Sequence, residues 1–240
     1  MMNMDIFGLA LRYFYVDKCK VELLVERDDG YSSLDDVSKY FSTYEYWRRC
    51  ERLAIQHAKG RVLDIGCGAG RHSLYLISKG FEVYSIDISP CALEVALRRG
   101  VPNPVLMDMN RLGFRDGIFN TIVLLGGGLG LAGKLDDIKK FLSYVRKLLC
   151  SNGVLIGSSA DPFKTLDARH IRYHERNRRR GIYPGTVKIR LAMNSLRSPW
   201  FYYTLLDPKT LQKICNETGW KIIKKYEDDY YYAVVLAKAH

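Results

Sequence analysis

The sequence predicts an α/β fold built on a doubly wound, mostly parallel sheet, and three observations indicate it. From Arg61 onward, short apolar runs alternate regularly with helical patterns, which is typical of parallel strands joined by helices. The first apolar run, at 61–65, passes through a glycine-rich turn directly into a helical pattern. The length of 240 residues suits one such domain carrying an insertion.

Each element after residue 60 is predicted from its own pattern. Apolar runs predict strands at 61–65, 81–86, 104–107, 117–125 and 154–159. Helical periodicity and stop residues predict helices at 70–79, 89–99, 135–149 and 208–218. Two final strands, 220–227 and 230–237, are joined by Asp228 and Asp229 and form a C-terminal hairpin.

The N-terminal segment has weaker patterns. Residues 10–15 have helical character, residues 20–26 have the apolar content of a strand, and Asp28–Gly30 predicts a turn. From Ser33 or Asp35 to about Lys59 the pattern predicts helix, interrupted near Ser42 and Thr43 and stopped by Gly60.

The turn after the first strand has glycines at alternate positions, Gly66, Gly68 and Gly70. Glycine adopts backbone angles that a sharp turn requires and lets a ligand approach the main chain. The helix that follows offers its N-terminal N–H groups to that ligand. The nicotinamide fingerprint needs a glycine at the sixth position from Gly66, which is Arg71 here, so this pattern fails.

The segment from Asp64 to Gly70 instead has the form D-x-G-x-G-x-G and resembles the first motif of class I S-adenosylmethionine-dependent methyltransferases. The resemblance covers roughly residues 60–160 and 205–240. It implies a Rossmann-like, seven-stranded sheet whose last strand is antiparallel. It also implies that S-adenosyl-L-methionine is the cofactor and S-adenosyl-L-homocysteine the product.

Asp87 stands at the end of the second predicted strand, 17 residues after Gly70. A carboxylate there can accept both ribose hydroxyls, and the resemblance implies that role. It also implies that Ile88 packs on the adenine, Asp108 holds its amino group and Asp64 orients the methionine moiety. Asp87 and Asp108 have an alternative role as local capping carboxylates. The predicted cofactor residues are Asp64, Gly66, Cys67, Gly68, Gly70, Asp87, Ile88, Asp108, Met109, Leu125 and Gly126.

The glycine-rich run 126–130 follows the fourth predicted strand of the core. It departs from the Asp/Asn-Pro-Pro-Tyr/Phe motif that similar enzymes use on exocyclic amines of bases or on glutamine. This departure counts against those substrates. A flexible glycine turn with no contact role is the alternative.

Residues 161–205 follow the fifth strand and are expected to form a lid over the cofactor. They contain ten lysines and arginines against three acidic residues, and an aromatic cluster at 199–204. A helix near 167–180 would place His170, Tyr173 and Asn177 on one side, and 186–193 alternates like a strand. The proposed catalytic residues are His170, Tyr173 and His174, and the proposed substrate residues are Asn177, Arg190, Trp200 and Tyr203. The alternative is that these arginines are solvated and the aromatics pack the lid.

We therefore expect a single methyltransferase domain. Its parts are a helical preface over 1–59, a cofactor-binding core over 60–160, a substrate lid over 161–205, and a C-terminal helix and hairpin over 206–240. The expected activity is methyl transfer to an oxygen, nitrogen or carbon nucleophile of a small molecule, for which the basic and aromatic lid suggests an anionic or aromatic character. The net charge of +11 keeps RNA, DNA or protein as alternative substrates. A protein that binds the cofactor without transferring methyl is a third alternative.

Other sequence features limit the class of protein. The six cysteines are scattered without a C-x-x-C pair, which favours free thiols and a cytoplasmic protein. No apolar stretch approaches the ~20 residues that span a membrane, and no secretory signal is evident. No metal-binding cluster is apparent. The oligomeric state stays open.

Overall fold

The computed structural model describes residues 5–239, and these form two compact units. The first contains the described residues up to Tyr46, together with Asp64–Leu112 and Lys188–Phe201. The second contains Trp47–Leu63, Gly113–Val187 and the described residues from Tyr202 onward.

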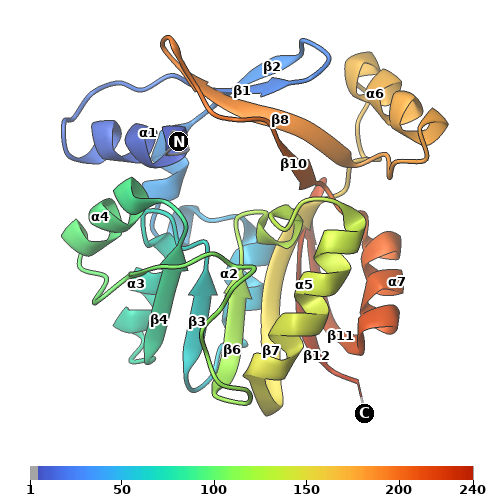
Figure 1. Ribbon diagram of the computed structural model, residues 1–240. Coiled ribbons are helices and arrows are strands. Elements are labelled where there is room, and N and C mark those ends of the chain that lie inside the picture. The colour runs from blue at the N-terminus through green and yellow to red at the C-terminus, as the bar shows by residue number, and fades with distance from the viewer. Residues whose placement is uncertain (1–4, 240) are drawn as a thin grey trace. The chain divides into compact units, whose positions relative to one another are not determined.

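The main sheet has seven strands in the order β11-β12-β7-β6-β3-β4-β5 (Figure 1). The β6–β7 and β4–β5 pairs are parallel, whereas β12 is antiparallel to both β7 and β11. The strands are β3 (Val62–Ile65), β4 (Val83–Asp87), β5 (Val105–Leu106), β6 (Phe119–Leu124), β7 (Leu149–Ala160), β11 (Trp220–Asp228) and β12 (Tyr231–Lys238). This mixed sheet confirms the predicted fold class, including the antiparallel C-terminal hairpin.

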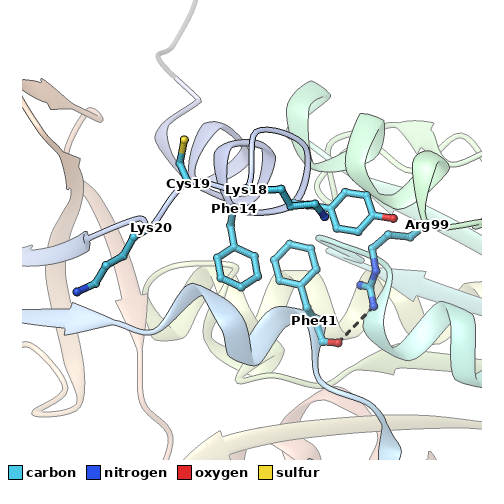
Figure 2. A pocket seen from close by; sticks show the side chains of 7 residues that line it. Phe14, Lys18, Cys19, Lys20, Phe41 and Arg99 are labelled. Carbon is cyan, nitrogen blue, oxygen red and sulfur yellow. Dashed lines mark hydrogen bonds between the residues drawn. The ribbon is translucent and has the colours of Figure 1, made fainter.

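In the first unit, three α-helices are α1 (Ile6–Tyr15), α3 (Arg71–Ser78) and α4 (Pro90–Arg98). The helix α1 packs against α4, and Asp5 joins their N-terminal ends. Its carboxylate accepts hydrogen bonds from Gly8 N at 2.9 Å and from Ser89 Oγ at 2.6 Å. At the other end of α1, the ring of Phe14 stacks on Phe41 with centroids 4.9 Å apart (Figure 2).

In the second unit, the helices are α2 (Arg49–Ile55), α5 (Leu135–Leu148), α6 (Ala168–Arg179) and α7 (Pro208–Thr218), with a 3₁₀ turn η3 (Gly128–Gly130). The α5 residues on the predicted apolar face, Ile138, Phe141, Leu142, Val145 and Leu148, are all buried. The indole of Trp220 donates to the Leu142 carbonyl at 3.1 Å, which ties β11 to α5. The helix α5 is therefore held to the unit by apolar burial and by one buried polar contact.

A second sheet has the order β10-β8-β1-β2, with β9 paired to β8. Its strands are β1 (Leu23–Arg27), β2 (Ser32–Asp35), β8 (Thr186–Met193), β9 (Leu196–Arg197) and β10 (Phe201–Thr204). Strand β1 runs antiparallel to β8, with Leu24 opposite Ala192. The N-terminal segment and the last part of the predicted insertion therefore share one sheet.

The helix predicted from Ser33 or Asp35 to about Lys59, within the helical preface, is wrong in its first half. Residues up to Asp35 belong to β2, and two 3₁₀ turns follow, η1 (Val37–Phe41) and η2 (Tyr44–Tyr46). The Asp36 carboxylate accepts hydrogen bonds from the Ser38 N–H and hydroxyl at 2.9 and 2.7 Å. Such local side-chain bonds compete with α-helix formation. The α2 helix also ends at Ile55, before the predicted stop at Gly60.

Candidate functional site

The turn between β3 and α3 is held in a fixed conformation by its glycines. Gly66, Gly68 and Gly70 have φ angles of 72°, 54° and 79°, a region that residues with a Cβ seldom adopt. The N–H groups of Gly66 and Cys67 donate to the Ile86 carbonyl at 2.9 and 3.0 Å. The turn is therefore anchored to the neighbouring strand β4.

Two of these glycines have different surroundings. A Cβ on Gly70 would lie 2.5 Å from Val101 Cγ2, so a side chain there would clash with the core. A Cβ on Gly68 would meet nothing closer than the Phe7 ring at 3.8 Å. Gly70 is thus required by packing, whereas the space in front of Gly68 can admit a ligand.

Asp87 connects this turn to the start of α4. Its Oδ2 accepts the Gly68 N–H at 2.8 Å and its Oδ1 accepts the Ser89 N–H at 2.9 Å. A carboxylate has about four lone-pair sites, so each oxygen keeps capacity for a ligand hydroxyl. Burial raises the pKa of Asp87, and these backbone hydrogen bonds oppose the rise. The helix cap itself comes from Ser89, whose hydroxyl accepts the Ala92 N–H.

Ile88 follows Asp87 and leaves 70% of its surface exposed. Leu106, opposite Asp87 in the β4–β5 pair, is 59% exposed. Large apolar side chains this exposed, next to a carboxylate with free acceptor capacity, offer a surface for a planar ring.

Asp108 caps the turn after β5, because its Oδ1 accepts the Asn110 N–H at 2.8 Å and the Asn110 side-chain amide at 3.1 Å. Among residues 5–239, no group forms a hydrogen bond with Asp108 Oδ2. Met109 beside it is half-buried. Both residues lie in the same unit as Asp87, and their contacts with adenine stay a prediction.

Asp64 is buried beneath α3. It accepts a 2.6 Å hydrogen bond from the Ser73 hydroxyl, which in turn accepts from Ser85 at 2.8 Å. Burial raises the pKa of Asp64 to about 6. Cys67 is also buried, and burial raises the pKa of its thiol, so the thiol is uncharged at neutral pH. A role for Asp64 toward the methionine moiety stays a prediction.

In the second unit, the residues after β6 are held by a buried carboxylate that the sequence patterns did not reveal. Glu51 of α2 is 2% exposed, and its Oε1 accepts the Gly126 N–H at 2.7 Å and the Ser158 hydroxyl at 3.0 Å. Ser158 accepts the Gly127 N–H at 3.0 Å. Neither Glu51 nor Ser158 belongs to a recognisable motif, because their link to Gly126, and hence to the turn that Leu125 begins, exists only in three dimensions.

The glycine run that begins at Gly126 is closely packed rather than loose. The Tyr203 hydroxyl donates to the Gly127 carbonyl at 2.9 Å. A Cβ on Gly127 would lie 2.4 Å from that hydroxyl, and one on Gly130 would lie 2.0 Å from the Thr204 carbonyl oxygen. Tyr203, predicted to bind substrate, therefore lies directly on the turn where the cofactor residue Gly126 was predicted.

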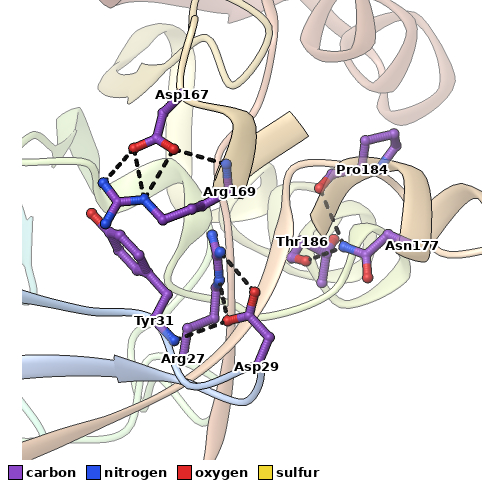
Figure 3. A network of polar contacts seen from close by, with 8 residues as sticks. All are labelled: Arg27, Asp29, Tyr31, Asp167, Arg169, Asn177, Pro184 and Thr186. Atoms are coloured by element: carbon purple, nitrogen blue, oxygen red, sulfur yellow. Dashed lines mark hydrogen bonds and ion pairs between the residues drawn. The ribbon is translucent and has the colours of Figure 1, made fainter. Parts of the chain in front are cut away.

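The predicted catalytic residues lie on α6, whose bounds nearly coincide with those of the helix predicted near 167–180. Tyr173, His174 and Asn177 are buried and His170 is half-buried. The Asn177 side-chain amide donates to the carbonyls of Thr186 at 2.6 Å and Pro184 at 3.2 Å (Figure 3). Asn177 thus holds the turn after α6, and its contact with substrate stays a prediction, as do the roles of both histidines and Tyr173.

Arg190 and Trp200 are brought together in the first unit. The Arg190 guanidinium lies 4.6 Å from the Trp200 ring and donates to Glu26 at 2.7 Å. Glu26 is opposite Arg190 in the β1–β8 pair, so this is a cross-strand ion pair of the second sheet. Arg27 on the same strand pairs through both its Nε and Nη2 with Asp29 at 2.8 Å (Figure 3).

The described residues were also compared with the patterns of metal sites, disulfides and membrane-spanning helices. Within residues 5–239, no cluster of histidine, cysteine, aspartate or glutamate has the arrangement of a metal site, and the six cysteines are free thiols. The helices described between these limits are too short or too polar to cross a membrane.

Comparison with known proteins matches the segment that contains the glycine turn to a protein family. Residues 63–157 match the family described as "Methyltransferase domain". The chain is 30% identical over 139 residues to the putative methyltransferase YqeM of Bacillus subtilis, covering 56% of each protein. It is 32% identical over 111 residues to the glycine/sarcosine N-methyltransferase of Parasynechococcus marenigrum, covering 44% of this chain and 39% of that protein. The chain thus spans about half the length of these curated relatives.

A solved structure is similar over nearly the whole chain. It is a SAM-dependent methyltransferase from Bacteroides fragilis, determined in complex with S-adenosyl-L-homocysteine. The TM-score is 0.83 at 27% sequence identity, and the match covers 98% of this chain and 95% of that one.

Proposed function

Because this chain belongs to the class I S-adenosylmethionine-dependent methyltransferase family, we propose that it transfers a methyl group from S-adenosyl-L-methionine to a nucleophilic atom of a small molecule. The observation that carries the proposal is the Gly68–Asp87 hydrogen bond beside the exposed side chain of Ile88. It joins a carboxylate with spare acceptor capacity, an open backbone turn and an apolar surface.

The residues of the first unit fit the parts of the cofactor. Asp87 would accept the ribose hydroxyls, and Ile88 would lie against the adenine. The open side of Gly68 would admit the chain that carries the sulfonium. The presence of S-adenosyl-L-homocysteine in the Bacteroides fragilis structure supports this assignment.

The bound cofactor supplies an activated methyl group, so the protein has to position and shield rather than activate the donor. The acceptor atom has to lie near ~3 Å from the methyl carbon, in line with the breaking bond. A base is needed only if the acceptor is a hydroxyl or a protonated amine. His170, Tyr173 and His174 remain our candidates for such proton transfer.

The second unit supports a small acceptor. Glu51 accepts the Gly126 N–H and Tyr203 donates to the Gly127 carbonyl, so the three glycines 126–128 after β6 form a backbone surface whose polar groups are fixed. We propose Tyr203, which donates to the Gly127 carbonyl, as a residue that contacts the acceptor. Two similar proteins are named for small-molecule substrates, the glycine/sarcosine N-methyltransferase of Parasynechococcus marenigrum and the demethylmenaquinone methyltransferase of Thermus thermophilus. Asn177, Arg190 and Trp200 remain further candidates for substrate contact.

A macromolecular substrate is the second candidate, and one observation favours it. Five arginines on or next to α6 are exposed, at 169, 172, 178, 179 and 180. Such a basic surface suits the phosphates of RNA.

The test is methyl transfer from labelled S-adenosyl-L-methionine to cell extract separated into small-molecule, RNA and protein fractions. Wild type is compared with Asp87→Ala and with Asp116→Ala, a matched exposed aspartate outside the site. Label in the small-molecule fraction that is lost only with Asp87→Ala would support the proposal. Label in RNA or protein would overturn the substrate class. Binding of S-adenosyl-L-homocysteine with no label in any fraction would indicate a non-catalytic binding protein.

A further inference from the structure

The first unit contains a cavity of 560 Å³ that no part of the proposed methyl-transfer site uses (Figure 2). It lies between the end of α1, η1 and the end of α4. Its lining residues are Phe14, Tyr15, Lys18, Cys19, Lys20, Phe41 and Arg99. A volume of this size is typical of small-molecule sites.

One wall of the cavity is aromatic. The rings of Phe14 and Phe41 stack with centroids 4.9 Å apart and an interplanar angle of 28°. The Tyr15 ring also stacks on Phe41, with centroids 5.7 Å apart and an interplanar angle of 5°. Nearly parallel rings present flat faces and edges that suit a further planar ring.

The rest of the lining is cationic. Lys18, Lys20 and Arg99 line the cavity and no acidic residue does. The Lys18 ammonium lies 4.7 Å from the Tyr15 ring, and the Arg99 guanidinium lies 5.0 Å from the Phe41 ring. None of the three forms an ion pair with a carboxylate in the described part of the chain. Asp17, next to Lys18, pairs with Arg12 instead.

Arg99 is the half-buried cation of the set. It donates through Nη1 to the Ala69 carbonyl at 2.5 Å and through Nη2 to the Phe41 carbonyl at 3.4 Å. A guanidinium has five N–H donors, so most of its donors remain for a ligand. Burial lowers the pKa of Arg99, and only Tyr15 opposes the shift. A half-buried cation without a carboxylate partner gains from an incoming anion.

We propose that this cavity binds a planar aromatic carboxylate, whose ring packs on Phe14 and Phe41 and whose carboxylate pairs with Arg99 and Lys18. The fork of a guanidinium matches the two oxygens of a carboxylate, and the aromatic wall selects a ring over an aliphatic chain. Arg99 also contacts the cofactor turn, because the carbonyl to which it donates belongs to Ala69, between Gly68 and Gly70.

Isothermal titration calorimetry with naphthalene-2-carboxylate as the probe tests this site without any methyl-transfer activity. We expect wild type to bind the probe and Arg99→Gln to bind it at least about tenfold more weakly, since charge-assisted hydrogen bonds are lost. Arg98→Gln is the matched control, because Arg98 precedes Arg99 on the chain and pairs with Glu94 outside the cavity. It should bind like wild type.

Ligand controls separate the two halves of the recognition. Naphthalene-2-methanol, which lacks the charge, should bind at least about tenfold more weakly than the carboxylate, and inorganic phosphate should not displace the probe. Equal binding of the alcohol and the carboxylate, or equal binding by wild type and Arg99→Gln, would overturn the proposal. Displacement by phosphate would overturn the role of the aromatic wall.

A second variant is needed because Arg99→Gln also loses the hydrogen bonds to the Ala69 and Phe41 carbonyls. That loss could weaken probe binding by disturbing the fold. Lys18 is exposed and forms no hydrogen bond with the residues between 5 and 239, so Lys18→Gln should fold normally and still weaken probe binding. Thermal unfolding of every variant accompanies the titrations. If Arg99→Gln unfolds and Lys18→Gln binds the probe as wild type does, the proposal fails.

Discussion

The Gly68 N–H donates a 2.8 Å hydrogen bond to Asp87 Oδ2, and so joins the two segments from which the cofactor site was predicted. The bond orients the Asp87 carboxylate from one side, and the Ser89 N–H orients it from the other. Because the carboxylate cannot rotate freely, its remaining lone pairs have fixed directions. A ligand hydroxyl therefore meets an acceptor that is already positioned.

Replacing this carboxylate should abolish most of the cofactor affinity. We expect Asp87→Ala to weaken S-adenosyl-L-homocysteine binding by about tenfold to a hundredfold, because hydrogen bonds to a charged group are lost. Isothermal titration calorimetry measures the change, with Asp116→Ala as the control. An affinity within twofold of wild type would show that Asp87 has only its structural contacts.

The two glycines of the turn should respond differently to alanine. Gly70→Ala should lower the free energy of unfolding by about 2–3 kcal/mol, because positive φ strain and the clash with Val101 add together. Gly68→Ala should cost only about 1 kcal/mol from backbone strain, yet it should weaken S-adenosyl-L-homocysteine binding. Urea unfolding and calorimetry separate the two effects. Equal losses of stability would contradict the packing role of Gly70.

Glu51 should be a determinant of stability. Its truncation to alanine leaves the Gly126 N–H and the Ser158 hydroxyl without their acceptor, which we expect to cost about 3 kcal/mol. Glu51→Gln retains an acceptor oxygen and should cost about 1 kcal/mol. Guanidinium unfolding measures both, with the exposed Glu22→Ala as the control. Similar losses for alanine and glutamine would show that the charge, rather than the acceptor, matters.

Asp64 should make stability depend on pH. Burial raises its pKa from the model-compound value of 3.8 to about 6, so between these values the folded state holds a proton that the unfolded state has released. The protonated Asp64 carboxyl therefore contributes about 3 kcal/mol to the free energy of unfolding. This contribution is fully present below pH ~4 and is lost as the pH rises through ~6.

The variant Asp64→Asn isolates this effect, because it cannot ionise and keeps a similar shape. Relative to wild type, its free energy of unfolding should increase between pH 4 and pH 7. Urea unfolding at several pH values in that range measures the difference. A difference that stays constant with pH would exclude a raised pKa for Asp64.

The sequence was sufficient for elements whose signal is local. The alternation from Val62 to Ala160 and the cap at Asp207 predicted most strands and helices close to their observed bounds, because each of these elements buries apolar residues of its own. The strand β7 is the exception, since it begins at Leu149 rather than at the predicted residue 154. The sequence was insufficient for the second sheet, since the pairing of β1 with β8 joins segments that are far apart in the sequence. Local bonding at Asp36 likewise replaced a helix that periodicity favoured.

The residues of the candidate site likewise fall into those predicted from local patterns and those that were missed. Gly68 and Asp87 were found because a strand, a turn and a helix start follow each other along the chain. Glu51 and Arg99 were missed because their contacts, Gly126 and Ala69, are distant in sequence and neither residue belongs to a motif. The pairing of Arg190 with Glu26 depends on the register between two strands, which no single segment of the sequence specifies. The predicted contact of Arg190 with substrate stays a prediction.

The pairing of β1 with β8 also has a consequence for synthesis on the ribosome. Strand β1 emerges before its partner β8, and the whole segment between Arg27 and Thr186 is made in the interval. Until then, one edge of β1 has its backbone hydrogen-bonding groups unpaired, and β2 alone is a weak partner. The nascent chain should therefore carry an exposed strand edge for much of its elongation, which is a site where chaperones or a second nascent chain can bind.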